Sequence, residues 1–314
     1  MLKGIVITGA TSSIGCALIE ECINQGIRVL AIANRGSKNI KWIPQDDLVS
    51  IVECSLEELG DLNYNVNNEY DAFVHLAWAS TAGAIARNML QPQAMNIKYS
   101  LDAVELAARI GCRVFLGAGS QAEYGRTDEI LTEYTVTHPE TGYGVAKLCA
   151  GQMTRLACRQ KGMQHIWTRI VSAYGPKCQP QSVINYTITE LLNGRTPSLS
   201  KGEQVWDFIY TGDVARAILL LLEKGLDGET YVIGFGKARK LSEFLLRIKD
   251  IVNPNVQLGL GDVEYGTNTV MHLACNISKL TNDTGFIPSI EFDEGIRRTE
   301  EWIKNESGYI KKEN

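Results

Sequence analysis

The residues whose types and spacing could do chemistry lie in a segment that ends at Lys147. Tyr143 and Lys147 are four residues apart, so a helix would place both side chains on one face. A free tyrosine has a pKa of about 10, and a neighbouring ammonium lowers it toward the range useful for proton transfer. Ser120 follows a predicted buried strand, where its hydroxyl would hold a substrate oxygen against the phenol. Together the three side chains would exchange a proton with a carbonyl/alcohol pair.

The spacing alone does not establish chemistry, because a solvated helix face that carries an aromatic residue shows it too. The surrounding pattern is more specific: short apolar strands alternate with helices. The predicted strands are Lys3–Thr8, Arg28–Ala33, Leu48–Val52, Ala72–Leu76, Arg113–Gly117, His165–Ile170 and Thr230–Gly234. The alternation predicts an α/β fold, a Rossmann-type doubly wound parallel sheet with right-handed crossovers.

After residue 171 the pattern loosens, and the later segments should cover the edge of the sheet where ligands bind. We expect a helix over Val183–Asn193, one strand over Val205–Tyr210, and further helices over Val214–Lys224, Leu241–Ile251 and Asp293–Asn305. Residues 1–172 and 206–236 are therefore assigned to a dinucleotide-binding domain. Residues 173–205 and 237–314 are assigned to a smaller, interleaved substrate-binding domain.

The first strand leads into TGATSSIG and then a helix, an order typical of a nucleotide-binding unit. Glycines in such a turn let the backbone approach a pyrophosphate, whose charge lies at the helix N-terminus. The residues expected at the cofactor are Gly9, Thr11, Ser12, Ser13, Ile14 and Gly15. Ser12 stands where a Gly-x-x-Gly-x-x-Gly spacing would require glycine, and its hydroxyl could bond to a phosphate. The other interpretation is a structural connection from strand to helix.

The second predicted strand is followed by Asn34 and Arg35, without a carboxylate that would bind the adenosine ribose of NAD. A guanidinium here favours the 2′-phosphate of NADP(H), with NAD(H) possible; the alternative is an exposed loop arginine. Leu76 and Ala77 end the fourth strand, and these small or apolar residues would let the backbone lie against the cofactor. His75 is expected to be a packed strand-end residue.

The 314 residues carry a net charge of -5 and a composition that is 45% hydrophobic and 21% charged. This balance is typical of a globular protein and favours neither a nucleic-acid nor a membrane partner. The eight cysteines contain no C-x-x-C pair, so free thiols in a reducing cytoplasm are expected rather than disulfides or a metal site.

Taken in order, these features resemble an extended short-chain dehydrogenase/reductase of the nucleotide-sugar epimerase/dehydratase/reductase group. The resemblance rests on Thr8-Gly9…Gly15, His75-Leu76-Ala77, Asn96, Ser120 before Tyr124-Gly125, Tyr143-x-x-x-Lys147, Tyr174-Gly175-Pro176 and Asp207-Phe208-Ile209-Tyr210…Asp213. It implies that Tyr143 is the catalytic acid/base and that Lys147 lowers its pKa and holds the nicotinamide ribose. Ser120 would bond to the reacting sugar oxygen. The substrate residues would be Ser120, Gln121, Tyr174 and Trp206.

Two departures from the group narrow the expected reaction. Dehydratases of the group carry an acidic pair directly after the catalytic Ser/Thr, but Gln121 and Ala122 stand there. Glu123 comes one position late and should face the opposite side. Trp206 replaces an arginine that related epimerases often use to bind the diphosphate; Lys177, Arg195, Lys201 or Arg239 are the possible substitutes.

The resulting first hypothesis is an NADPH-dependent reductase of a 4-keto-6-deoxy nucleotide sugar, active in deoxysugar biosynthesis. The second is an NAD-dependent nucleotide-sugar 4-epimerase, and a third is a non-catalytic NAD(P)-binding sensor. Proteins that look like this one usually form homodimers, so dimerisation through the helices near residues 93–110 and 142–160 is expected.

Overall fold

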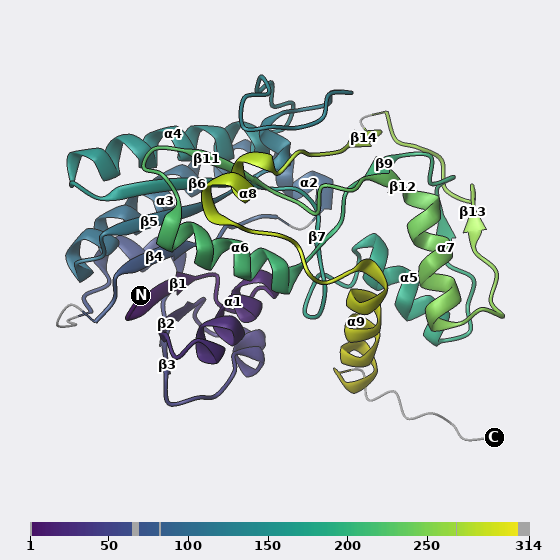
Figure 1. Ribbon diagram of the computed structural model, residues 1–314, viewed down its shortest axis with the longest axis horizontal. Coiled ribbons are helices and arrows are strands. Elements are labelled where there is room, and N and C mark those ends of the chain that lie inside the picture. The colour runs from purple at the N-terminus through teal and green to yellow at the C-terminus, as the bar shows by residue number, and fades with distance from the viewer. Residues whose placement is uncertain (1, 65–68, 82, 268, 307–314) are drawn as a thin grey trace.

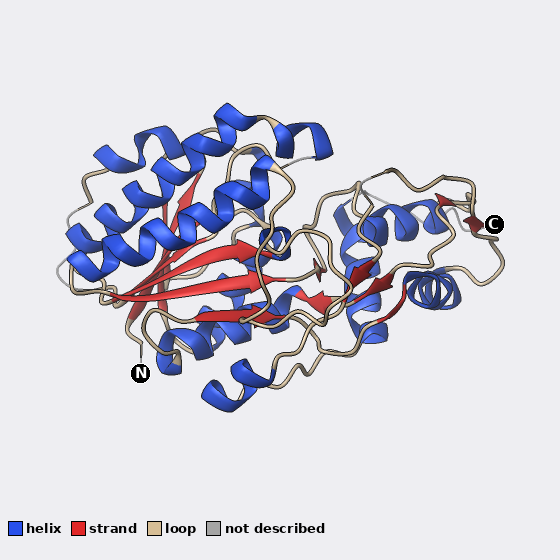
Figure 2. Cartoon of the chain, turned by 90° about the horizontal axis from the view of Figure 1, so that it is seen from above, coloured by secondary structure: helices blue, strands red, loops and turns tan. Residues whose placement is uncertain are grey.

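The structure is a computed structural model that describes residues 2–64, 69–81, 83–267 and 269–306. Strands and helices alternate through the first half of the chain, and a second, smaller lobe follows (Figure 1). Figure 2 shows the two lobes side by side, with the large sheet in one and mostly helices in the other.

Seven parallel strands form the main sheet, in the order β3-β2-β1-β4-β5-β6-β11. They are β1 (Gly4–Thr8), β2 (Arg28–Ala33), β3 (Val49–Glu53), β4 (Ala72–His75), β5 (Val114–Ser120), β6 (Gln164–Ile170) and β11 (Thr230–Ile233). The inner strands are buried along their length because helices cover both faces of a parallel sheet. The order is that of a Rossmann fold, so the predicted fold class is confirmed.

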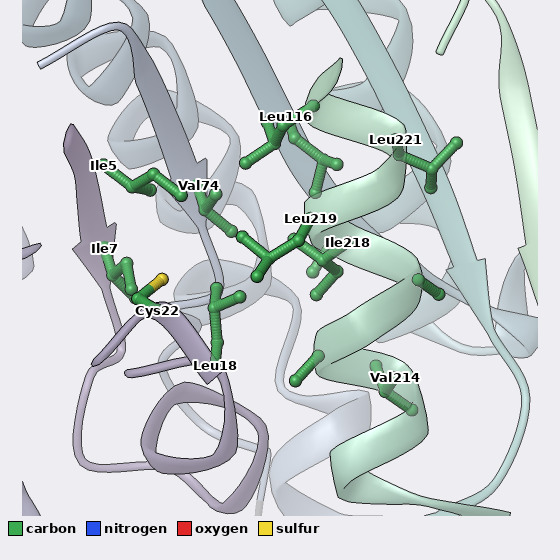
Figure 3. Close-up of a cluster of buried hydrophobic side chains, with 14 of the residues drawn as sticks. Ile5, Ile7, Leu18, Cys22, Val74, Leu116, Val214, Ile218, Leu219 and Leu221 are labelled. Atoms are coloured by element: carbon green, nitrogen blue, oxygen red, sulfur yellow. The ribbon is translucent and has the colours of Figure 1, made fainter. Parts of the chain in front are cut away.

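Helices cover both faces of this sheet (Figure 2). One face packs against α1 (Ser13–Asn24), α6 (Thr211–Lys224) and α8 (Ser278–Thr284), the other against α3 (Leu90–Ile110) and α4 (Gly142–Gln160). On the first face, Leu18 and Ile218 lie near Val74 of the sheet, all three without solvent exposure (Figure 3). Burying one such aliphatic side chain contributes about 1.5–3 kcal/mol. This packing fixes the carboxyl ends of the strands.

The second lobe has its own apolar core, which includes Ile188, Phe244 and Phe292. Its helices are α5 (Val183–Leu192), α7 (Leu241–Val252) and α9 (Phe292–Glu306). Short strand pairs complete it: β8 (Ser198–Leu199) with β13 (Gly259–Leu260), and β9 (Val205–Trp206) with β12 (Arg239–Lys240) and β14 (His272–Leu273).

The strand predicted over Val205–Tyr210 is broken, which corrects that expectation. β9 joins the second lobe, whereas β10 (Ile209–Tyr210) pairs with β7 (Ala173–Tyr174). Between them the Asp207 carboxylate turns inward and accepts two main-chain N–H groups, from Phe235 at 2.8 Å and Gly236 at 2.8 Å. Because the side chain of Asp207 bonds to the segment after β11, the pairing between strands is interrupted at this residue.

Several short elements were not predicted. They are the 3₁₀ turns η1 (Lys38–Trp42), η2 (Leu56–Asp61) and η3 (Gln121–Glu123), the helix α2 (Gly83–Asn88), and α8. All eight cysteines carry free thiols. Among the helices that the structure describes, none is both long enough and apolar enough to cross a membrane.

Candidate active site

A cavity of about 1050 Å³ opens at the carboxyl ends of β1, β2 and β4. It brings together most of the residues predicted at the cofactor: Gly9, Thr11, Ser12, Ser13, Asn34, Leu76 and Ala77. Parallel α/β sheets bind ligands at the carboxyl ends of their strands, at the point where the order of the strands in the sheet reverses direction. The size also suits a dinucleotide, since ligand cavities commonly measure about 300–1,000 Å³.

The turn between β1 and α1 has the backbone geometry that a pyrophosphate requires. Gly9 has a φ of +70°, and a Cβ there would lie 2.8 Å from the main-chain nitrogen of Ala77. A Cβ on Gly15 would lie 2.4 Å from the Gly9 carbonyl oxygen. The Ser12 hydroxyl accepts the Gly15 N–H at 3.0 Å, which caps α1 and leaves the hydroxyl hydrogen for a phosphate. The residues present therefore fit a dinucleotide.

Arg35 lies outside the set of residues that line the cavity. Its exposed guanidinium donates to a Glu58 carboxylate oxygen at 3.1 Å. Glu58 belongs to the capping box of η2, so this acidic partner is itself fixed in place. Ile14 and Gly15 also do not line the cavity; they shape the turn from within the fold.

The three predicted catalytic side chains come together next to this cavity. Ser120 ends β5, and its hydroxyl is hydrogen-bonded to the phenol of Tyr143. α4 carries Tyr143 and Lys147 one turn apart, and Thr141 caps the helix by accepting the Gly144 N–H at 3.0 Å. The Lys147 ammonium donates to the Ala118 carbonyl and lies 5.8 Å from the centre of the Tyr143 ring. This group can pass a proton to or from an oxygen held by Ser120.

The charge balance of the group differs from the expected one. Burial raises the pKa of Tyr143 above its usual value, opposed by the hydrogen bond with Ser120 and by the charge of Arg87. Burial also lowers the pKa of Lys147 to about 7. The cation that lowers the Tyr143 pKa in this structure is Arg87, whose guanidinium carbon lies 5.2 Å from the ring centre. The role expected of Lys147 stays a prediction, and its pKa of about 7 leaves it only partly charged near neutral pH.

Trp78 separates Lys147 from the cavity, and it was missed as a site residue. Its ring centre lies 3.7 Å from the Lys147 ammonium, and its indole lies edge-on to Tyr143. The indole N–H donates to the Gln93 side chain at 2.9 Å. Asn96, predicted to be a polar strut, bonds both main-chain polar groups of Ala79, at 2.9 and 3.0 Å. A tryptophan in a segment of small residues was the signal that sequence reasoning passed over.

The predicted substrate residues have different surroundings. Gln121 opens η3 directly after Ser120 and is half-buried. Trp206 donates its indole N–H to the Ser172 hydroxyl at 2.9 Å, a partner that sequence reasoning missed. Tyr174 is only 3% exposed, packed against other aromatic rings, and its hydroxyl donates to the Phe292 carbonyl at 3.3 Å. Tyr174 therefore packs the second lobe in this structure, and its role as a substrate contact stays a prediction.

Of the four cations considered as diphosphate partners, Lys177 alone belongs to the residues that line the cavity. Its ammonium donates to Glu20 of α1 at 2.8 Å. Arg195 is held by Glu190 at 2.6 Å, and Arg239 lies over the Phe244 ring at 4.4 Å. Lys177 is thus the one of these four cations that lies at the dinucleotide cavity.

His75 is packed at the end of β4, as expected. Its ring bonds the Thr8 hydroxyl at 2.8 Å, and burial lowers its pKa to about 3. In the ranges that the structure describes, no group of three or more His, Cys, Asp and Glu side chains could hold a metal ion.

Comparisons with known proteins agree with this geometry. The family model described as NAD dependent epimerase/dehydratase family matches residues 5–234. A dTDP-glucose 4,6-dehydratase of Escherichia coli is 25% identical, with 98% of this chain and 94% of that protein covered. The solved UDP-glucose 4-epimerase of Thermotoga maritima, in a structure with UDP-glucose, has a TM-score of 0.83 at 23% identity, covering 97% of this chain and 99% of that one.

A second solved structure, UDP-glucuronic acid 4-epimerase of Bacillus cereus in complex with UDP-glucuronic acid and NAD, gives a TM-score of 0.83 at 20% identity. It covers 96% of this chain and 99% of that one. Both structural likenesses support the fold. The family model spans most of the chain, including the phosphate turn and all three catalytic candidates. The chain therefore belongs to the NAD dependent epimerase/dehydratase family and is an enzyme of the extended short-chain dehydrogenase/reductase type.

Proposed function

We propose that this enzyme is an NADPH-dependent reductase of a 4-keto-6-deoxy nucleotide sugar. The observation that supports the proposal, by disfavouring dehydration, is the burial of Glu123, the one acidic residue directly downstream of Ser120. Its side chain is fully buried and paired with Arg169 at 2.8 Å. The two positions directly after Ser120, where dehydratases of the group carry an acidic pair, hold Gln121 and Ala122, which cannot exchange the protons that removal of water requires.

Hydride and proton transfer do not need that acidic pair. When bound, NADPH supplies a hydride to the carbonyl carbon of the sugar. Tyr143 donates its hydroxyl proton to the carbonyl oxygen, which becomes the alcohol, and Ser120 stabilises the oxygen as negative charge develops. The raised pKa of Tyr143 keeps the phenol protonated at neutral pH, as an acid must be. Turnover is complete when the phenolate regains a proton from solvent.

Residues 173–205 and 237–314 are proposed to hold the nucleotide part of the substrate, because most of the apolar core of the second lobe comes from described residues in these ranges. Lys177 is the proposed partner of the diphosphate, and Arg35 that of the 2′-phosphate of NADPH. For the second role Arg35 would exchange Glu58 for the phosphate.

A second candidate is an NAD-dependent 4-epimerase, favoured by the pairing of Arg35 with Glu58, which leaves no free cation on that side chain. The two structurally similar epimerases are consistent with it.

The test measures oxidation of NADPH and of NADH at 340 nm with a 4-keto-6-deoxy nucleotide sugar. We expect NADPH to be preferred, Arg35→Ala to weaken NADPH binding much more than NADH binding, and Tyr143→Phe to abolish turnover without loss of cofactor binding. The matched control Arg28→Ala removes another exposed arginine held by a glutamate. Interconversion of 4-hydroxy nucleotide sugars without net cofactor consumption would instead establish the epimerase.

A further inference from the structure

Glu123 has no solvent exposure, although it lies three residues from Ser120 and close to the reacting groups. One carboxylate oxygen accepts the main-chain N–H of Ser120 at 2.9 Å. Ser120 in turn caps η3 through its hydroxyl, which accepts the Ala122 N–H at 3.2 Å. The main chain and side chain of Ser120 are therefore fixed relative to Glu123.

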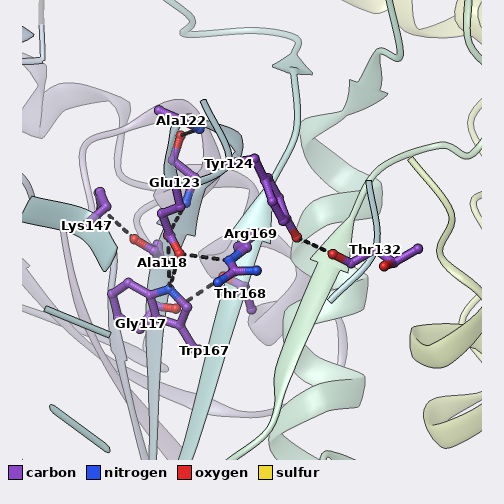
Figure 4. Close-up of polar contacts among 11 residues, drawn as sticks. Gly117, Ala118, Ala122, Glu123, Tyr124, Thr132, Lys147, Trp167, Thr168 and Arg169 are labelled. Atoms are coloured by element: carbon purple, nitrogen blue, oxygen red, sulfur yellow. Dashed lines mark hydrogen bonds and ion pairs between the residues drawn. The ribbon is translucent and has the colours of Figure 1, made fainter. Parts of the chain in front are cut away.

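The neighbouring strand β6 holds the other side of this carboxylate. Trp167 donates its indole N–H to the first oxygen at 3.0 Å, and the Arg169 Nε–H donates to the second at 2.8 Å. The Arg169 guanidinium also lies 4.5 Å from the centre of the Tyr124 ring. Figure 4 shows these side chains around Glu123, with Lys147 directed toward the Ala118 carbonyl. The carboxylate is thus held by two neutral N–H donors and by the charged guanidinium of Arg169.

Glycines make the space for this network. A Cβ at Gly119 would lie 2.3 Å from a Glu123 carboxylate oxygen, and a Cβ at Gly117 would lie 2.3 Å from the Trp167 ring. On α4, a Cβ at Gly151 would lie 2.7 Å from the same ring. Since no larger residue fits at these positions, the packing of β5, β6 and α4 is built around the buried carboxylate and its indole partner.

The charge of Glu123 also reaches the catalytic pair. It raises the pKa of Tyr143. It also raises the pKa of Lys147, but by less than burial lowers that pKa. Tyr143 also faces Ser120 and Arg87, and the charge of Arg87 acts in the opposite direction. The other charged and titratable neighbours of Lys147 are His75 on β4 and Tyr143 on its own helix.

We propose that Glu123 is a positioning residue of this active site, which fixes Ser120 through its main chain and acts on Tyr143 and Lys147 through its charge. The carboxylate touches neither substrate nor cofactor. Its role therefore differs from that of the acidic pair in dehydratases, whose place is taken by Gln121 and Ala122. The proposal rests on the assignment of Tyr143 and Lys147 as catalytic groups, but a readout without substrate can test it.

Trp78 provides that readout, because its ring lies 3.7 Å from the Lys147 ammonium. The fluorescence of the ligand-free enzyme is titrated from pH 5 to 9, and the signal of the Trp78→Phe variant is subtracted to remove the other tryptophans. We expect a transition with a midpoint near the Lys147 pKa of about 7. The same titration of Glu123→Gln is corrected with the double variant Glu123→Gln/Trp78→Phe. Its midpoint should be lower than that of wild type by about half a pH unit or more, because a neighbouring anion favours the ammonium.

The matched control is Asp213→Asn, which neutralises another fully buried carboxylate, paired with Arg216 at 2.6 Å. This variant should lose stability but keep the wild-type midpoint. Glu123→Asp, which retains the charge, should restore most of the midpoint. If Glu123→Gln does not fold because Arg169 is left unpaired, the double variant Glu123→Gln/Arg169→Met removes both charges. It should also titrate at lower pH, by a smaller amount.

A second measurement uses the pH dependence of turnover. With Tyr143 as the acid, the rate falls as pH rises through its pKa, so Glu123→Gln should move this alkaline limb to lower pH. A wild-type midpoint in folded Glu123→Gln, or no Trp78-dependent transition at all, would overturn the proposal whatever the substrate is. A shifted midpoint in an enzyme that does not reduce keto sugars would support it and refute only the proposed function.

Discussion

Replacing Lys147 by methionine is expected to inactivate the enzyme and stabilise its fold at low pH. Methionine keeps the length of the side chain and removes the charge. The ammonium is buried, since only 3% of the residue is exposed. Catalytic groups held in unfavourable surroundings commonly reduce stability in this way.

The magnitude follows from the pKa of Lys147, which burial lowers from 10.5 to about 7. The difference is about 3.5, and each unit corresponds to about 1.36 kcal/mol, so the folded state carries a penalty of about 5 kcal/mol. The unfolded chain binds this proton more tightly, so stability increases as pH rises from about 7 to 10.5. The penalty is complete below pH 7 and absent above 10.5.

Methionine also gives up two interactions, the hydrogen bond to the Ala118 carbonyl and the contact with the Trp78 ring. Their loss costs about 1–3 kcal/mol. We therefore expect Lys147→Met to be about 2–4 kcal/mol more stable than wild type at pH 6. Near pH 10.5 wild type should be the more stable of the two proteins. Burial of Lys147 no longer costs free energy there, so only the loss of the two contacts distinguishes the variant.

The assay is urea unfolding followed by circular dichroism at several values between pH 6 and 10. The buried thiols, whose pKa values are raised, titrate in both proteins and cancel in the difference. Lys224→Met is the control, since the exposed Lys224 also donates to a carbonyl, that of Thr284 at 2.9 Å. A stability difference for Lys147→Met that does not change with pH would refute the argument.

Three further outcomes follow from positions already described. Gly15→Ala should cost about 1–3 kcal/mol and weaken dinucleotide binding at least about tenfold by calorimetric titration, because its Cβ would press on the Gly9 carbonyl; unchanged binding would place the pyrophosphate elsewhere. Asp207→Asn weakens two bonds from main-chain N–H groups and should lower the free energy of unfolding by about 2–3 kcal/mol in urea; an unchanged midpoint would contradict it. Trp206→Arg adds a cation beside Ser172 and should tighten binding of a nucleoside diphosphate such as UDP, whereas no change would indicate that the diphosphate lies away from β9.

Most of the fold follows from patterns that are local in sequence. The helix over Gly142–Gln160 is found with the predicted ends, because Thr141 caps it and Lys161 and Gly162 end it. The turn between β1 and α1 is also determined mostly by local contacts. Gly15 is required by contacts with residues close in sequence, and Gly9 by a contact with Ala77. Glu123 is buried, but Gln121–Glu123 form the 3₁₀ turn η3, so counting along an extended segment does not account for the direction of its side chain.

What could not be predicted depends on partners far apart in sequence. The pKa of Lys147 is low because the ammonium is buried, and Trp78, which is held by Gln93, covers it. The helical spacing of Tyr143 and Lys147 does not reveal these contacts. Tyr174 turns into an aromatic cluster that only the folded second lobe creates. The break at Asp207 likewise requires main-chain donors from the segment after β11.

The second lobe assembles from segments made at very different times on the ribosome. The apolar face of α5 packs with that of α9, which lies almost at the end of the described chain. Between them the chain must return to the large sheet and add β11 at its edge. During synthesis, Ile184 and Ile188 therefore emerge long before their cover exists. Until α7 and then α9 have been made, this apolar face has no cover within the second lobe, and apolar surface exposed in this way is prone to aggregation.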